Sequence, residues 1–275
     1  MNIGFIGTGN MGTILIEALI ESKAVNPSFL SITNRTLEKA KTLKNKYPEI
    51  QLAETPEDVI LQSELIFLCV KPLDIYPFLS KHSRLFTEKQ CLITITSPIR
   101  VDQIEQIVPC QTARIIPSIT NRAFAGISLI TYGSSCTDKT KTNILQLLKG
   151  ISLPVQIEER ITRVASDIVS CGPAFFSYLV QRFIDAAVAE TNISHAEATV
   201  LSKEMLVGLG KLLEKEHYTL PSLQEKVCVK GGVTGEGIKA LDEGIGDMFH
   251  RLFRSTHTKF EEDLSLIKKQ FPASS

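Results

Sequence analysis

The chain has 275 residues, 43% of them hydrophobic, and its thirty basic residues balance thirty acidic ones, which gives a formal net charge of zero. A neutral chain has no overall attraction to nucleic acid or to an anionic membrane, so neither is an expected partner; only a local charged patch is left open. The length allows a large core and suits two domains better than one. The six cysteines are scattered and form no C-x-x-C pair, so we expect reduced thiols in a cytoplasmic protein rather than a zinc or redox site.

The first sixteen residues carry no charged side chain, which raises the question of a secretory signal. Signal peptides need a basic start and a continuous apolar core, whereas glycine, threonine and asparagine interrupt this stretch. The most apolar long segment, residues 168–190, contains Gly172, Pro173, Arg182 and Asp185, which a bilayer would not accept. We therefore expect a soluble protein.

Short apolar runs alternate with amphipathic ones over residues 1–157, which is typical of a βαβ sheet. Strands covered by helices on both faces are apolar almost throughout, and residues 36–47 show the lysine-rich helical pattern expected between two such strands. The predicted strands are residues 2–6, 30–34, 64–70, 91–96, 113–117 and 125–133.

The pattern changes near Glu158, because helical spacing dominates from there to the end. The predicted fold class is α/β: an N-terminal Rossmann-type doubly wound sheet over 1–157, followed by an all-α domain over 158–275. The helical region has more apolar positions than a single layer over a Rossmann domain would bury, so we expect it to form a homodimer or a larger homo-oligomer.

The glycines of the stretch 2–12, "NIGFIGTGNMG", follow the G-x-G-x-x-G spacing between an expected strand and an expected helix. In that context the first glycine permits a tight turn, the second lets backbone approach a pyrophosphate, and the third allows close packing of helix and strand. The N–H groups at the helix start attract the phosphates. An ordinary glycine turn is the alternative. The candidate cofactor-binding residues are Gly7, Thr8, Gly9, Asn10, Met11 and Gly12.

The end of the second expected strand indicates which dinucleotide is bound. NAD-binding versions have an acidic residue there, which accepts hydrogen bonds from the ribose hydroxyls. This chain has Asn34, Arg35 and Thr36 instead. A guanidinium pairs with a 2′-phosphate, and Asn34 and Thr36 supply further donors, so the sequence favours NADP. The alternative is that Arg35 is only a solvated surface charge.

Six motifs in order along the chain resemble those of the pyrroline-5-carboxylate reductase family, and within it a divergent branch, the late competence proteins. They are "IGFIGTGNMG" (3–12), "NRT" (34–36), "CVKP" (69–72), "RIIPS" (114–118), "SCGPAFF" (170–176) and "VKGGVTGEGIKAL" (229–241). The resemblance implies a Rossmann domain, an interlocking helical dimer and hydride transfer from NADPH to the imine carbon of a small cyclic substrate.

The resemblance also assigns site residues. Val70, Lys71 and Pro72 would line the cofactor edge, and the loop from Val229 to Thr234 would hold the substrate carboxylate. The candidate catalytic residues are Thr234, nearest the ring, and Lys230; the candidate substrate-binding residues are Gly231, Gly232, Val233, Cys171 and Gly172.

The chain departs from the family pattern in these same loops. Val229 and Lys230 replace a serine and a proline, so a carboxylate loses one donor and gains a cation. Cys171 replaces a serine, Ser118 an asparagine, and residues 97–99 read Ser-Pro-Ile in place of A-G-I. The leading hypothesis is an NADP-dependent reductase of pyrroline-5-carboxylate or a related cyclic imine, and the runner-up is a weakened or inactive member with a regulatory role in competence or differentiation. A β-hydroxyacid-type reductase is a third option, but the helical lysine motif that it needs is missing.

Two further features have ordinary interpretations. His250 and His257 lie seven residues apart without a third ligand, so we expect no metal site. Cys171 precedes an expected helix start, where the pKa of a thiol falls, so we expect it to be somewhat reactive without being a nucleophile in the reaction.

Overall fold

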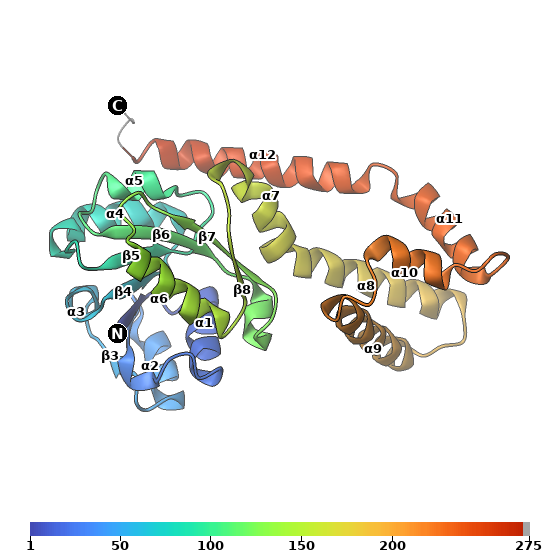
Figure 1. Cartoon of the computed structure of the whole chain (residues 1–275), viewed down its shortest axis with the longest axis horizontal. Helices are drawn as coiled ribbons and strands as arrows, with labels where there is room; N and C mark the ends of the chain where they lie inside the picture. The colour runs from blue at the N-terminus through green and yellow to red at the C-terminus, as the bar shows by residue number, and fades with distance from the viewer. Residues whose placement is uncertain (272–275) are drawn as a thin grey trace. The chain divides into compact units, whose positions relative to one another are not determined.

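The computed structural model describes residues 1–271 (Figure 1). It separates into two compact units. The first contains Met1–Pro173 together with the chain from Ser255 onward, and the second contains Ala174–Arg254. These units are defined by contacts, whereas the functional division between residues 157 and 158 stays a prediction.

The first unit is built on an eight-stranded sheet of order β3-β2-β1-β4-β5-β6-β7-β8. All neighbouring pairs are parallel except β6 and β7, which are antiparallel. The strands are β1 (Ile3–Ile6), β2 (Leu30–Thr33), β3 (Gln51–Leu52), β4 (Leu65–Leu68), β5 (Cys91–Thr94), β6 (Gln111–Ile116), β7 (Ile127–Tyr132) and β8 (Leu153–Gln156). The six expected strands are present, and the fold is the predicted Rossmann type.

The two edge strands of the sheet, β3 and β8, were not predicted from the sequence. β3 has only two residues, too few for a periodic pattern. β8 contains Pro154, which a strand tolerates only at an edge or at its start, and its Leu153 is exposed. Edge strands lack the double burial that makes inner strands recognisable as continuous apolar runs.

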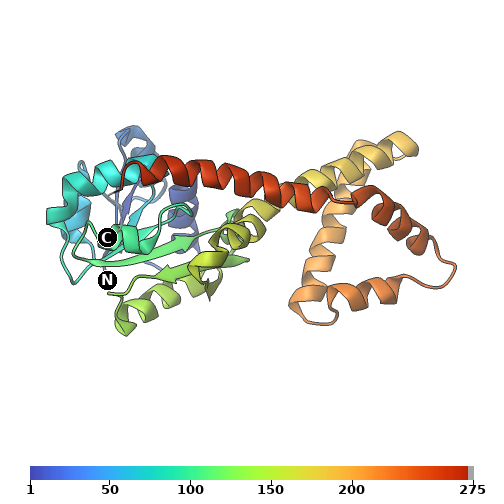
Figure 2. The same ribbon diagram turned by 90° about the horizontal axis from the view of Figure 1, so that it is seen from above.

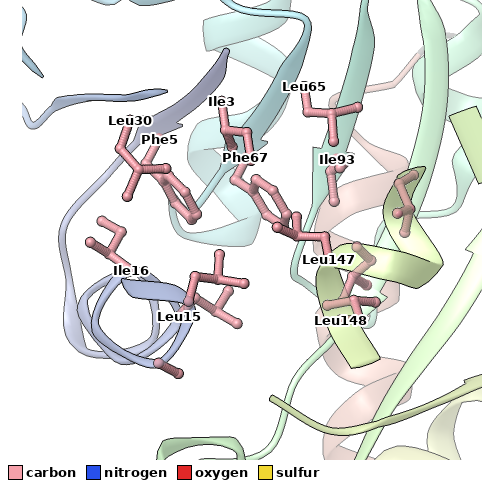
Figure 3. Packing of buried hydrophobic residues seen from close by; sticks show 14 of the residues in the cluster. Ile3, Phe5, Leu15, Ile16, Leu30, Leu65, Phe67, Ile93, Leu147 and Leu148 are labelled. Atoms are coloured by element: carbon pink, nitrogen blue, oxygen red, sulfur yellow. The ribbon is translucent and has the colours of Figure 1, made fainter. Parts of the chain in front are cut away.

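Helices cover both faces of the sheet in the first unit. Figure 3 shows Leu15 and Ile16 of α1 and Leu147 and Leu148 of α6 directed toward strand residues such as Phe5 and Phe67, whose rings stack with centroids 4.6 Å apart. The second core, on the other face, takes residues from three helices of this unit and from the end of α12 (Met248–Lys268). The helices of this part are α1 (Asn10–Glu21), α2 (Leu37–Lys46), α3 (Pro56–Gln62), α4 (Pro72–His82), α5 (Val101–Glu105) and α6 (Asp138–Lys149).

The rest of the chain is helical. A short α7 (Thr162–Ser166) continues through a π-helical turn (Asp167–Cys171) into α8 (Gly172–Glu190). The remaining helices are α9 (His195–Glu214), α10 (Leu220–Val227), α11 (Val233–Ile245) and α12 (Met248–Lys268). Figures 1 and 2 place the end of α12 beside α4, where Gln270 donates a hydrogen bond to the Leu73 carbonyl at 3.2 Å. No helix within residues 1–271 has the length and apolar character needed to cross a membrane.

A charged network joins α1, α2 and the 3-10 helix Ile119–Ala123. Arg122 donates to Glu21 at 2.9 Å, and the Tyr47 hydroxyl donates to the same carboxylate at 2.6 Å. These hydrogen bonds, that of Arg122 first, lower the pKa of Glu21 to about 2.

A carboxyl group whose pKa is lowered by folding stabilises the native state above its unfolded pKa, and the contribution disappears as the pH falls through the folded value. We expect Glu21→Gln to lower the free energy of unfolding by about 1 kcal/mol at pH 7, with the gap to wild type closing between pH 4.5 and pH 2. Urea unfolding of both proteins at several pH values measures this gap. A gap that is the same at pH 7 and pH 2.5 would contradict the assignment.

Candidate functional site

A pocket of about 600 Å³ opens at the carboxyl ends of β1, β2 and β4. β1 lies between β2 and β4, so the strand order reverses there, and doubly wound sheets bind their ligands in the crevice at this position. The lining residues are Ile6, Gly7, Gly9, Thr33, Asn34, Arg35, Thr36, Lys39, Glu54, Pro56, Cys69, Val70, Lys71, Asp74 and Phe78. The structure thus brings together the glycine loop, the residues after β2 and the residues after β4.

The three glycines of the first loop differ in what surrounds them. Gly7 has φ +106°, and a Cβ there would lie 2.5 Å from the Cys69 carbonyl oxygen, so only glycine fits the turn. A Cβ on Gly12 would overlap the carbonyl oxygen of Gly7, where helix and loop pack closely. At Gly9 a Cβ would meet nothing within 4 Å, so the backbone faces open space in the pocket. This open approach is what a pyrophosphate requires.

Three of the helix N-termini around the pocket are left without side-chain caps. The N-cap residues of α1, α2 and α4 are Gly9, Thr36 and Lys71, and none of them caps its helix through a side-chain hydrogen bond. The fourth, that of α3, whose first residue Pro56 also lines the pocket, is capped by Thr55. Uncapped N-termini keep their N–H groups and positive dipole ends available for an anion. Three of them at one pocket favour a ligand with several phosphates.

Asn34 connects two of the pocket loops. Its Oδ1 accepts a hydrogen bond from the Thr8 N–H at 3.0 Å, and its Nδ2 donates to the Thr36 carbonyl at 2.9 Å. The amide therefore holds the glycine loop and the loop after β2 in one arrangement. The sequence did not indicate this role, because it depends on a contact between residues 26 positions apart. A contact of Asn34 with phosphate stays a prediction.

Cationic side chains line the pocket near the expected 2′-phosphate. Arg35 is exposed, and Lys39, in the first turn of α2, lines the same pocket. Lys39 was not among the predicted residues, although it falls in the expected helix of residues 36–47, four residues after Arg35. The hydroxyl of Thr8 is buried and has no partner among the described residues. The residues present therefore fit a phosphorylated dinucleotide.

The segment before α8 lies against the end of β6. The Ser118 hydroxyl donates to the Val169 carbonyl at 2.8 Å, and the Ser170 hydroxyl donates to the Pro117 carbonyl at 2.7 Å. This reciprocal pair holds Cys171 and Gly172, two of the predicted substrate residues, in the first unit.

The expectation for the thiol of Cys171 is wrong. Cys171 closes a π-helical turn that is continuous with α7 and α8, so it does not precede a helix start. Burial raises the pKa of this thiol, and Arg163, whose Nη2 lies 3.6 Å from the sulfur, offsets only part of that effect. The thiol therefore stays protonated at neutral pH.

The predicted carboxylate loop lies in the second unit. Gly231 has φ +75°, and the Gly232 N–H donates to the Val229 carbonyl at 2.9 Å, which closes a turn before α11. Gly232 is the N-cap of α11 and offers no side chain, whereas Ser194 and Thr219 cap α9 and α10. The start of α11, with Val233 exposed and Thr234 in its first turn, is thus open to an anion. The loop and the cofactor pocket belong to different units, so their combination in one site stays a prediction.

No group of three or more histidine, cysteine or acidic side chains in the described part of the chain is arranged to hold a metal ion. His257 instead lies 3.7 Å from the Asp167 carboxylate, which also accepts from Arg163 at 2.6 Å and from the Thr256 hydroxyl at 2.8 Å. The contacts of the Asp167 carboxylate are therefore with neighbouring protein side chains, which is a structural role.

Two family models match the chain. One, "NADP oxidoreductase coenzyme F420-dependent", covers residues 2–98, and the other, "Pyrroline-5-carboxylate reductase dimerisation", covers residues 159–263. The NADP class expected from Arg35 is thus confirmed for the family, and the helical region matches a dimerisation domain.

Curated relatives extend over the whole chain. ComE operon protein 4 of Bacillus subtilis is 64% identical and covers 98% of this chain and 99% of its own. Pyrroline-5-carboxylate reductase 3 of the same organism is 28% identical, with 98% of each chain covered.

Solved structures show the same fold. A pyrroline-5-carboxylate reductase from Coxiella burnetii superposes with a TM-score of 0.83 at 21% identity, covering 99% of both chains. The Plasmodium falciparum pyrroline carboxylate reductase with NADP bound gives 0.82 at 17% identity, covering 97% of this chain and 98% of that one. Together with the two relatives, these matches show that the chain belongs to the pyrroline-5-carboxylate reductase family, in the branch that contains ComE operon protein 4.

Proposed function

We propose that the protein is an NADP-dependent reductase that converts pyrroline-5-carboxylate to proline, or reduces a closely related cyclic imine. The observation that carries this proposal is the pocket at the reversal of strand order, in which three uncapped helix N-termini and Arg35 surround an open glycine loop. An acidic residue in place of Arg35 would have repelled a 2′-phosphate. The family match supplies the C=N bond as the reaction type.

The chain's own residues bind and orient, and NADPH, when bound, supplies the hydride. Gly9, Asn10 and the first turn of α1 would hold the pyrophosphate, with Arg35 and Lys39 at the 2′-phosphate. The turn from Lys230 to Thr234 would hold the substrate carboxylate on the N–H groups at the start of α11. A protonated imine is already electrophilic, so positioning supplies most of what the reaction needs.

The direct test mixes purified protein with NADPH and pyrroline-5-carboxylate and follows the absorbance of the reduced nicotinamide. We expect substrate-dependent NADPH oxidation and formation of proline. No oxidation by a protein that binds NADPH would refute the proposed activity on this substrate.

A second function competes with the first. The relative at 64% identity carries an operon name and no reaction, and Val229 and Lys230 alter the loop that should bind the substrate. A member that keeps the nucleotide site and has lost turnover would serve as a regulatory protein in competence or differentiation. NADPH binding without reduction of any cyclic imine favours that alternative.

We also propose that the protein is cytoplasmic. All six cysteines are free, and three of them, Cys91, Cys110 and Cys136, are buried. Reduced thiols of this kind persist in the reducing cytoplasm, where NADPH is also available.

The protein should be a homodimer or a larger homo-oligomer. Within Ala174–Arg254, all of which the structure describes, the buried apolar side chains are Ile184 and Ala198, whereas Phe176, Tyr178 and Phe183 are each more than 60% exposed. A helical unit with so small a core needs a partner to cover its apolar faces.

We therefore expect light scattering at micromolar concentration to give at least about 60 kDa, twice the monomer mass of 30.4 kDa. Phe183→Asp should shift the mass toward the monomer, whereas Lys41→Asp, on α2 of the first unit, should leave it unchanged. A stable wild-type monomer would refute the dimer.

A further inference from the structure

Arg114 on β6 is the largest fully buried side chain of the described molecule, and its guanidinium contacts three separate segments. Nη1 donates to the carbonyls of Ser97 and Ile99 at 3.1 and 3.2 Å. Both terminal nitrogens donate to Glu159, at 3.0 and 2.7 Å. Nη2 also donates to the hydroxyls of Thr131 and Thr162, at 3.2 and 2.7 Å.

The first of these segments is the loop that follows β5. β5 is parallel to β4 and pairs with it from Leu65–Cys91 to Leu68–Thr94, so both strands end at the same edge of the sheet. The loop after β5 therefore emerges at the edge where the glycine loop lies. Pro98 has no N–H, and the two carbonyls that Arg114 binds, those of Ser97 and Ile99, flank it.

The second segment leads to the predicted substrate residues. Glu159 precedes α7 and Thr162 is the first residue of that helix, and the helical path runs from there without a break to Cys171 and Gly172. The far end of this path is held by the Ser118 and Ser170 hydrogen bonds to the end of β6. Both ends of the segment 159–172 are thus held from β6 and the two residues after it, through Arg114 at one end and through residues 117 and 118 at the other.

The ion pair is asymmetric in its exposure. The Arg114 side chain is 0% exposed and that of Glu159 is 41% exposed, at the wall of a pocket of about 290 Å³. A buried guanidinium is costly unless its charge and donors are satisfied, and Nε already has no partner among the described residues, so losing the loop carbonyls or the carboxylate would add to that cost. Replacing Arg114 would disturb the core, whereas a change at Glu159 alters the same contacts from the solvent side.

We propose that Arg114 and Glu159 form a positioning pair, which sets the loop 97–99 and the segment 159–172 in the geometry that hydride transfer needs. Neither residue is required to touch substrate or cofactor. The proposal rests on the proposed reductase function and adds a specific pair of residues that acts through the two segments.

Hydrogen–deuterium exchange of the full chain tests the coupling without any reaction. Glu159→Gln keeps the side-chain size and removes the charge that Arg114 binds. We expect amides in residues 97–104 and 162–171 to exchange at least about threefold faster, with residues 4–16 unchanged. Thr131→Val is the matched control, because it removes a hydrogen bond of Arg114 that involves neither segment. Faster exchange confined to residues 157–163, or equal effects in the two variants, would overturn the proposal.

Steady-state kinetics test the effect on the reaction. Misplacement by about 1 Å can cost about 100-fold in rate, so we expect kcat of Glu159→Gln to fall at least about tenfold. The KM for NADPH should change less than about threefold, because other loops form the phosphate pocket, and Thr131→Val should keep both constants. If kcat falls only in proportion to the fraction of protein that is folded, the pair has a structural role and the inference is overturned. If wild type reduces no imine, the proposed function fails, while the exchange measurements still decide the coupling.

Discussion

Replacing Arg35 by aspartate is expected to weaken NADPH binding by at least about 2 kcal/mol, roughly 30-fold in affinity. The substitution removes a charge-assisted contact with the 2′-phosphate and places an anion against it. Lys39 lines the same pocket and remains, so binding should be weakened rather than abolished. NADH has no 2′-phosphate, and its affinity should change much less. Calorimetry with both dinucleotides measures the two changes.

Lys41→Asp provides the control for this experiment. Lys41 lies on α2, which begins two residues after Arg35, pairs with Glu38 at 2.6 Å and does not line the pocket. Lys41→Asp makes the same change of charge as Arg35→Asp. If both variants lost the same NADPH affinity, the loss would come from the overall electrostatic field of the protein and not from a contact of Arg35. Equal affinities of wild type for NADH and NADPH would show that the cofactor assignment to Arg35 is wrong.

The double substitution Val229→Ser with Lys230→Pro is expected to raise turnover of pyrroline-5-carboxylate by about tenfold or more, if the protein is a weakened reductase. A serine restores a donor for the carboxylate, and a proline replaces a long, flexible cation. Among the described residues the Lys230 N–H donates to no protein acceptor, so a proline at this position removes no hydrogen bond. Lys230 also does not have a positive φ, which a proline could not adopt. The Gly232 hydrogen bond to the Val229 carbonyl is kept.

The control for the loop is Val227→Ser, which makes the same chemical change at an exposed valine at the end of α10. Its turnover should equal that of wild type. If the natural substrate relies on the Lys230 cation, the double variant should instead lose activity on that substrate. If wild type and the double variant both bind NADPH but neither oxidises it, the result favours the regulatory function.

The inner strands and the cofactor loop were predictable because their signals are local. A strand buried on both faces must be apolar along its length, as "LIFL" (65–68) and "CLIT" (91–94) are. Gly7 and Gly12 occupy positions where the structure has no room for a Cβ. The spacing of these glycines in the sequence therefore follows from the lack of space for a side chain at each position. The same reasoning failed for β3 and β8, whose edge positions impose no such pattern.

By itself, the amino-acid sequence determined the six inner strands, the change to a helical region, the glycine turn and the cation after β2, since each depends on residues close together in the chain. Only the tertiary structure decided what Asn34 binds, that Cys171 lies within a continuous helix with a raised thiol pKa, and that Arg114 joins the loop after β5 to Glu159. Buried polar groups must find partners, and the fold chooses those partners from distant segments: Arg114 and Glu159 are 45 residues apart. No local pattern records such a choice, because it depends on which chain segments the packed core brings within hydrogen-bonding distance.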